Sequence, residues 1–118
     1  MTMPEFKQLV DELKKDVQEI ELDELEKMQA NGEDVVIIDV RESQDSQQSM
    51  IPGAVAIPRG MLELNIDQVT SDKDKTIVLY CGGGSRSALA AWMLQKMGFR
   101  NVLSLAGGFK AWRDKHGK

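Results

Sequence analysis

The sequence of 118 residues has a single cysteine, Cys81, and a single histidine, His116. One cysteine cannot form a disulfide within the chain, and a free thiol is best kept in a reducing compartment, so we expect a cytoplasmic protein. One cysteine and one distant histidine also fall short of the ligand set of a zinc site and give the thiol no nearby base. We therefore expect no metal and no other cofactor.

Long apolar runs are absent as well. No segment approaches the roughly 18 to 20 apolar residues of a transmembrane helix, and the charged segment 1–16 lacks the apolar stretch of a secretory signal. Basic residues interleaved with aromatic ones, a pattern typical of nucleic-acid binding, are also missing. We expect neither a membrane nor a nucleic acid as partner. Hydrophobic residues make up 42% and charged residues 29%, as in a soluble globular protein with one domain.

The charges are unevenly distributed along the chain. Residues 1–34 contain 11 acidic and 4 basic side chains, whereas residues 35–118 contain 8 acidic and 11 basic ones. From Cys81 onward, Asp114 is the one acidic residue against seven basic ones. A positive half around the thiol favours a small anionic substrate or an acidic partner protein. A solvated face on which lysines and arginines happen to cluster explains the same pattern equally well.

Short apolar segments alternate with amphipathic ones. Continuous apolar runs predict strands at 35–40, 54–57, 76–80 and 101–105, with an extended piece at 19–21. Helical spacing predicts helices at 3–17, 22–30 and 86–97, a short helix and turn at 61–69, and a last helix after Gly107 and Gly108. The polar segment 43–49 predicts a loop or a frayed helical turn. Trp92, Met93 and Met97 recur at helical spacing, so we expect them in the core.

This alternation predicts an α/β domain with a mostly parallel sheet, preceded by a helical extension at residues 1–17. In such folds, ligands bind beyond the carboxyl ends of the strands. Cys81 follows one predicted strand, and Asp39 and Arg41 lie at the end of another. We therefore expect the three residues to converge at one edge of the sheet.

Cys81 lies on a glycine-rich turn between a predicted strand and a predicted helix, in the segment YCGGGSRS at 80–87. Glycines allow the backbone to curl and to direct successive N–H groups inward, and the helix N-terminus adds positive potential. A thiol in this environment ionises readily, and the thiolate is the nucleophilic form. A lone cysteine is otherwise more often a small buried hydrophobic residue; the flanking glycines, Arg86 and Ser87 favour the nucleophile.

Four segments together resemble the single-domain rhodaneses, a family of sulfurtransferases. They are IDVRE at 38–42, IPGA at 51–54 with IPRG at 57–60, YCGGGSRS at 80–87, and LAGGFKAW at 105–112. The chain departs from the family pattern at Ser49-Met50, where the family usually has Gly-His, and in the serine- and glutamine-rich stretch before it. This divergent segment, 43–50, predicts different packing beside the active site and a different docking partner there.

The resemblance implies a rhodanese-like domain at 18–118, with helices on both faces of the sheet, and a two-step transfer of sulfur. A small anionic donor such as thiosulfate gives a sulfane sulfur to the Cys81 thiolate, and the resulting persulfide passes it to cyanide or to a thiol. Two alternatives stay open. The protein is a persulfide carrier that exchanges sulfur with a sulfur-relay protein, or it is a non-catalytic interaction module with the same fold.

The resemblance and the chemistry of the loop also imply the site residues. Cys81 is the expected catalytic nucleophile, and Asp39 is expected to support the loop in a structural role. Arg41 either binds the anionic substrate or pairs with a local carboxylate. The expected substrate-binding residues are Gly82, Gly83, Gly84, Ser85, Arg86, Ser87 and Arg41.

The length of the loop separates two chemistries. Four residues lie between Cys81 and Arg86, whereas the dual-specificity phosphatases of the cell cycle, which are similar in fold, have one more. A phosphate with its four oxygens needs the wider loop, and a single sulfur fits the tighter one. The count therefore favours sulfur transfer over phosphate chemistry.

Overall fold

Five parallel strands form the centre of the computed structural model, which describes residues 3–117. The strands are β1 (Gln18–Ile20), β2 (Val35–Asp39), β3 (Val55–Ala56), β4 (Thr76–Tyr80) and β5 (Asn101–Leu105). The helices are α1 (Pro4–Leu13), α2 (Leu22–Ala30), α3 (Ser43–Gln48), α4 (Leu62–Asn65), α5 (Ser85–Lys96) and α6 (Gly108–His116). The strand order is β1-β5-β4-β2-β3, and every pairing is parallel. The predicted α/β fold with a parallel sheet is thus confirmed.

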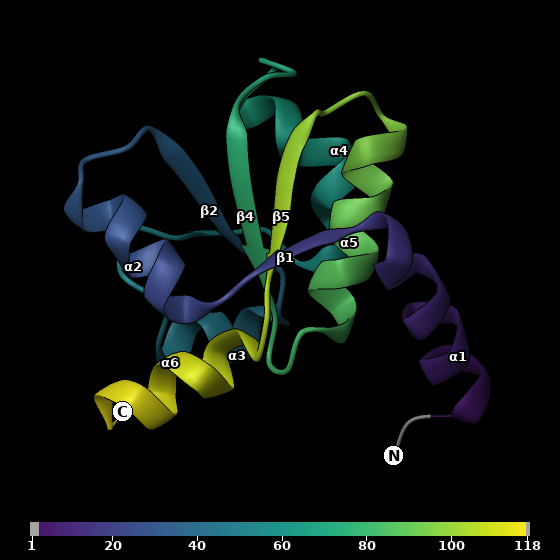
Figure 1. Cartoon of the computed structure of the whole chain (residues 1–118), viewed down its shortest axis with the longest axis horizontal. Coiled ribbons are helices and arrows are strands. Elements are labelled where there is room, and N and C mark those ends of the chain that lie inside the picture. The colour runs from purple at the N-terminus through teal and green to yellow at the C-terminus, as the bar shows by residue number, and fades with distance from the viewer. Residues whose placement is uncertain (1–2, 118) are drawn as a thin grey trace.

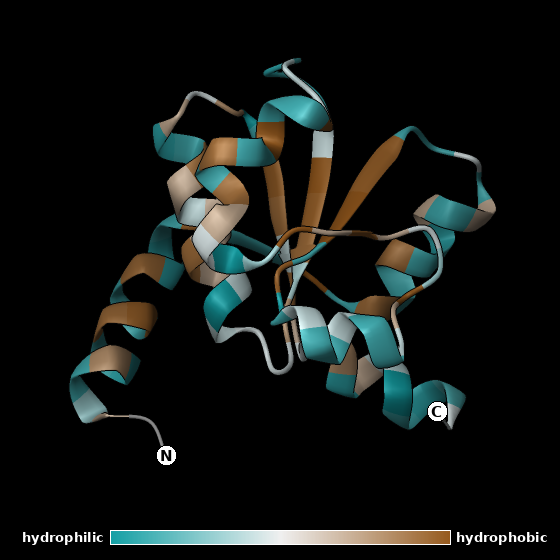
Figure 2. Cartoon of the chain, turned by 180° about the vertical axis from the view of Figure 1, so that it is seen from behind, coloured by the Kyte–Doolittle hydropathy of each residue, from teal (hydrophilic) through white to brown (hydrophobic). Residues whose placement is uncertain are grey.

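Helices cover both faces of the sheet, as the resemblance implied (Figure 1). Successive residues of a strand point to opposite faces, so β4 contributes to two cores. Ile77 and Leu79 pack in the core beneath α5, whereas Val78 and Tyr80 pack in the core beneath α2 and α6. Figure 2 shows the hydrophobic strands enclosed between the two helical layers. The order of the strands places β4, which precedes Cys81, in the middle of the sheet.

Two expectations from the sequence hold only in part. The segment 43–49, expected to be a loop or a frayed helical turn, contains the six-residue helix α3, in which only Ser46 is buried. Trp92 packs against the core but is only half-buried, as is Met93, and the expectation for Met97 is wrong because it is exposed. The buried face of α5 consists instead of Ser87, small alanines and Leu94, because small side chains allow the helix to lie close to the sheet.

The N-terminal helix packs against the rest of the chain. Val10 and Leu13 of α1 are buried, and Leu13 and Val17 belong to the core cluster beneath α5. The division of the chain into an extension, 1–17, and a domain, 18–118, stays a prediction. Among residues 3–117, no helix has both the length and the apolar character needed to cross a bilayer.

Candidate active site

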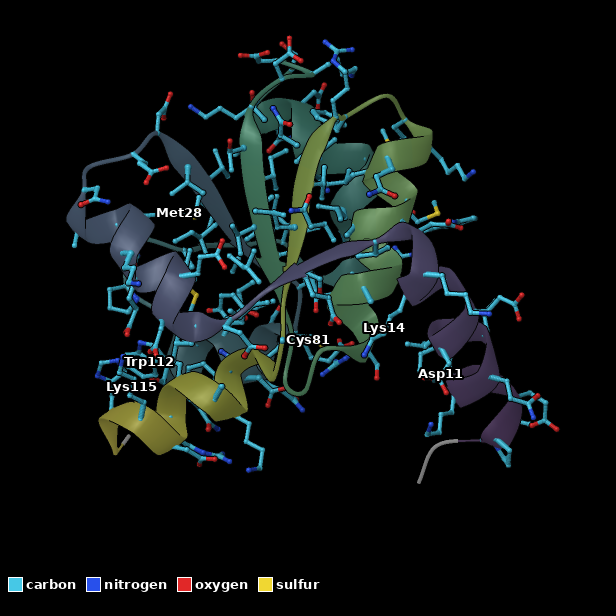
Figure 3. The ribbon with its side chains drawn as sticks, viewed as in Figure 1. Asp11, Lys14, Met28, Cys81, Trp112 and Lys115 are labelled. Atoms are coloured by element: carbon cyan, nitrogen blue, oxygen red, sulfur yellow. The ribbon has the colours of Figure 1, made fainter. Side chains whose placement is uncertain are left out.

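Cys81 lies where β4 ends, and α5 begins four residues later. Figure 3 shows it at the lower end of the sheet, beside the first turn of α5. The turn depends on Gly84, whose φ of +112° is left-handed and favours glycine. A side chain at Gly84 would also approach the backbone of the neighbouring β5–α6 turn, with the Gly107 nitrogen at 3.7 Å. The sequence thus folds the loop tightly around the sulfur.

Backbone N–H groups surround the thiol. Cys81 is 1% exposed, and its Sγ accepts hydrogen bonds from Gly84 N at 3.1 Å and from Ser87 N at 3.4 Å. The Ser87 hydroxyl lies 3.6 Å away. Three contacts from one loop and one helix N-terminus therefore converge on a single buried sulfur.

These contacts favour the ionised form of Cys81. Burial by itself opposes ionisation and is the largest single influence on the thiol. Hydrogen bonds from the Ser87 hydroxyl and from the N–H groups of Ser87, Gly84 and Gly83 together outweigh it and lower the pKa of the thiol. The site thus stabilises a thiolate, the form in which cysteine acts as a nucleophile.

The first turn of α6 holds the same loop from the other side. Phe109 N donates to the carbonyl oxygen of Cys81 at 2.7 Å, and Lys110 N donates to that of Gly82 at 3.1 Å. Gly108 permits this contact, because a Cβ at this position would lie 2.3 Å from the Cys81 oxygen. From the sequence, the glycine pair 107–108 opens the last helix and belongs to a family motif, but nothing in the sequence indicated that it contacts the thiol loop.

Ser104 is a residue that the sequence did not single out. It lies on β5, is fully buried, and places its Oγ 2.8 Å from Ser87 Oγ. A single serine within an apolar strand gives no signal of its own. Only the packing of α5 over β5 brings its hydroxyl next to the thiol site.

Asp39 and Arg41 form a buried ion pair beside the site. Arg41 Nη2 lies 2.8 Å from Asp39 Oδ2, and the Tyr80 hydroxyl donates to the same oxygen at 2.9 Å. Burial opposes ionisation of Asp39, but the bonds from Arg41 and Tyr80 keep the pKa of its carboxyl below the ordinary value. The Arg41 guanidinium also lies 4.1 Å above the ring of Phe109. Of the two roles expected for Arg41, the geometry shows the pairing with a carboxylate.

A cleft of about 380 Å³ opens over the loop. It is lined by Arg41, Asp45, Gly82, Gly83, Arg86, Phe109, Lys110 and Arg113. Four of these residues are basic and one is acidic, so the cleft suits an anion. Within residues 3–117, Arg86 and Arg113 form no ion pair, whereas Lys110 pairs with Asp114 at 2.9 Å. Ser85 is exposed and lies outside both the cleft lining and the bonds to the sulfur.

Some of the basic side chains after Cys81 thus lie together at the cleft. Arg86 was an expected residue, whereas Lys110 and Arg113 were noted only as part of the basic half after Cys81. Their position on α6 follows from the packing of this helix against the loop. No group of three histidine, cysteine or acidic side chains in the part of the chain that the structure describes is arranged to hold a metal ion.

The chain is similar to known proteins over most of its length. The family model of the rhodanese-like domain matches residues 21–115. The chain belongs to the rhodanese-like domain family. A sulfurtransferase from Allochromatium vinosum is 36% identical over 86% of this chain and 92% of its own length. The thiosulfate sulfurtransferase GlpE of Coxiella burnetii is 35% identical over 70% of this chain and 76% of its own length.

A solved structure from Rhodopseudomonas palustris matches the whole chain. It has a TM-score of 0.87 and 36% identity, and it covers 100% of this chain and 96% of its own. It is described as a protein of unknown function and a possible tyrosine phosphatase. Membership of the rhodanese-like family and the sulfurtransferases among the relatives support sulfur transfer as the general activity of this protein.

Proposed function

We propose that this protein transfers a sulfane sulfur from thiosulfate, or a related anionic donor, to cyanide or a thiol through a persulfide on Cys81. The observation that supports this most is the buried Cys81 sulfur, which accepts hydrogen bonds from the N–H groups of Gly84 and Ser87 in a loop that also lines a cleft with four basic side chains. The basic residues attract the dianion, and the N–H groups stabilise negative charge on sulfur.

The chemistry balances in two steps. The Cys81 thiolate attacks the outer sulfur of thiosulfate, the S–S bond of the donor breaks, and sulfite leaves with the bonding electron pair. The acceptor then attacks the outer sulfur of the persulfide, and the Cys81 thiolate leaves. Cyanide becomes thiocyanate and a thiol becomes a persulfide, with no external oxidant or reductant. Arg86 and Arg113 hold the anionic donor in this scheme, and Arg41 shapes the cleft from its ion pair with Asp39.

Intact-protein mass spectrometry with thiosulfate tests the first step, and thiocyanate formation tests the second. We expect the wild type to gain the mass of one sulfur, to lose it with cyanide or reductant, and to turn over. Cys81→Ser changes one atom of the side chain and serves as the matched control. A Cys81→Ser variant that still forms thiocyanate, or a wild type that gains no sulfur from any donor, would refute the proposal.

A second candidate is a persulfide carrier that receives and delivers sulfur through protein contacts. Lys110 and Arg113 at the cleft are exposed, so a partner with acidic side chains around its own thiol could reach them. A carrier would gain the sulfur on Cys81 but form thiocyanate slowly, and it would load faster from a cysteine desulfurase than from thiosulfate. Both candidates require a free thiol, so we propose a reducing, cytoplasmic location.

Phosphate chemistry is the third outcome to measure, given the description of the Rhodopseudomonas palustris structure. The four-residue spacing between Cys81 and Arg86 argues against it. We expect no hydrolysis of p-nitrophenyl phosphate under conditions in which the persulfide forms. Hydrolysis that depends on Cys81 would instead favour a phosphatase.

A further inference from the structure

The Ser87 hydroxyl has three polar neighbours and a single proton. Its Oγ lies 3.6 Å from Cys81 Sγ, 3.2 Å from the Gly84 carbonyl oxygen and 2.8 Å from Ser104 Oγ. All three side chains involved, those of Cys81, Ser87 and Ser104, are buried. Because a hydroxyl donates one hydrogen bond at a time, its proton has to be directed to one of these neighbours.

The Ser104 hydroxyl depends on Ser87 for a hydrogen bond. Within residues 3–117, its Oγ forms a hydrogen bond only with Ser87 Oγ, and a buried hydroxyl without a partner would cost free energy. When the Ser87 proton goes to Gly84 or to Cys81, Ser87 Oγ can only accept from Ser104. The Ser104 hydroxyl is then the donor of this pair.

The Gly84 carbonyl does not depend on Ser87 for a partner. It also accepts from the N–H of Ala88 at 3.2 Å, so the Ser87 proton can turn away and leave no buried carbonyl unpaired. A neutral thiol can donate its own weak S–H to Ser87 Oγ, whereas a thiolate can only accept. Ionisation of Cys81 therefore reverses the bond between the two side chains.

We propose that Ser104 is a positioning residue of the thiol site, whose hydroxyl donates to Ser87 Oγ and thereby keeps the Ser87 proton available for the Cys81 thiolate. Bonds in such a buried chain polarise one another, so the donor at the far end strengthens the bond at the sulfur. Ser104 touches no reacting atom. Its importance for sulfur transfer rests on the proposed function, in which the thiolate starts the reaction.

Ser104→Thr and Ser104→Val are the matched test, because threonine and valine have nearly the same shape and differ in the hydroxyl. Thiolate absorbance followed against pH reports the ionisation of Cys81, the single cysteine, whatever its accessibility. We expect the valine variant, and Ser104→Ala, to ionise at higher pH than the threonine variant and the wild type. Alkylation by iodoacetamide below the midpoint should be about threefold slower in the valine variant than in the threonine variant. Equal midpoints for the threonine and valine variants would overturn the proposal.

The charged groups around the sulfur stay the same in these variants. They are Arg86 on α5, Arg41 and Asp39 at the end of β2, Asp45 on α3, and Lys110 and Arg113 on α6. A difference between the threonine and valine variants therefore reports the hydroxyl and not a changed field. Retained cooperative thermal unfolding is the control for the fold of each variant.

A measurement on the wild type keeps the proposal testable if a variant does not fold. With isotope-labelled serine, the Ser104 Cβ resonance should shift with pH at the same midpoint as the Cys81 thiol, and a Ser104 resonance that ignores this midpoint would rule the coupling out. A wild type that forms no persulfide would refute the proposed function, but the ionisation midpoints of the threonine and valine variants could still be compared. Equal midpoints would refute the role of Ser104 and leave the persulfide chemistry intact.

Discussion

The hydroxyl of Tyr80 donates a hydrogen bond to Asp39 Oδ2 over 2.9 Å and so joins β4 to β2 directly before the thiol loop. The same hydroxyl oxygen accepts the N–H of Ile51 at 3.0 Å. One side chain therefore connects the strand that ends at Cys81, the strand that ends at the buried ion pair, and the turn that follows α3. Tyr80 is fully buried, so none of these bonds can be replaced by bulk water.

Tyr80→Phe should destabilise the protein by about 2 kcal/mol, because it leaves the buried Ile51 N–H without a partner and removes one bond to Asp39 Oδ2, which keeps its bonds from Arg41. Asp39→Asn should cost about 3 kcal/mol or more, since the buried Arg41 guanidinium loses its counter-charge. Urea denaturation of both single variants and of the double variant measures the coupling between the two positions. Additive losses would show that the bond between Tyr80 and Asp39 contributes nothing of its own.

The stability of the wild type should depend on pH through Cys81. The folded protein holds the pKa of this thiol below its ordinary value of 9.0. The thiolate therefore contributes stability that is fully present above the unfolded pKa and is lost as the pH falls through the folded pKa. The free energy of unfolding of the reduced wild type, minus that of Cys81→Ala, should thus rise as the pH increases from the folded pKa of Cys81 to its unfolded pKa. A difference that stays flat in denaturation curves across this range would contradict a lowered pKa.

Gly108→Ala should disturb the thiol loop far more than an alanine at another left-handed glycine. A Cβ at Gly108 would lie 2.3 Å from the Cys81 oxygen, whereas one at Gly32 would meet no atom within 4 Å; the two glycines have φ values of +53° and +68°. Both variants place an alanine Cβ in the left-handed region, which costs about 1–2 kcal/mol, and only Gly108→Ala adds a clash, worth about 1–3 kcal/mol more. Thermal unfolding and sulfur loading measure the two effects. Sulfur loading that is equally impaired in both variants would argue against the clash.

Arg113→Gln should weaken the binding of thiosulfate. Arg113 lines the cleft, whereas Arg100 lies near the amino ends of the strands and pairs with Asp74 at 2.6 Å. We expect the KM for thiosulfate to rise about threefold at low salt in Arg113→Gln, with a flatter salt dependence, because an exposed charge acts through a screened field. Arg100→Gln, with the same loss of charge, should leave the KM unchanged. Equal effects of the two substitutions would mean that only the net charge matters.

The sequence predicted β4 and β5 with their bounds, because both are short, continuous apolar runs enclosed between two layers of helices. It could not decide between a loop and a helical turn for α3. That helix begins with the N–H groups of Asp45 and Ser46 bonded to the carbonyl of Glu42, and such short backbone turns leave no apolar period in a polar sequence.

Site residues that lie in one continuous segment could be named from the sequence. Site residues that come from distant segments were harder to name. Cys81 and the glycines after it stand together in the chain. Ser104 and Arg113 come from β5 and α6, and their relation to the sulfur follows from helix packing that no local pattern specifies. The pairing of Arg41 with Asp39 was one of two roles left open by the sequence, and its contact with Phe109 joins the end of β2 to α6.

The stacking within α6 gives the thiol loop an optical reporter. Trp112 is nearly buried and stacks on Phe109 with ring centres 5.5 Å apart, and the N–H of Phe109 bonds to the Cys81 carbonyl. At the other end of the helix, His116 and Lys115 hold α6 to Glu26 of α2, and Figure 3 shows Trp112 and Lys115 on the side of α6 that faces α2. If the proposed persulfide forms on Cys81, an indole ring fixed between this anchor and the loop should change its fluorescence on loading. Sulfur loading and unloading would then be followed in real time without any label.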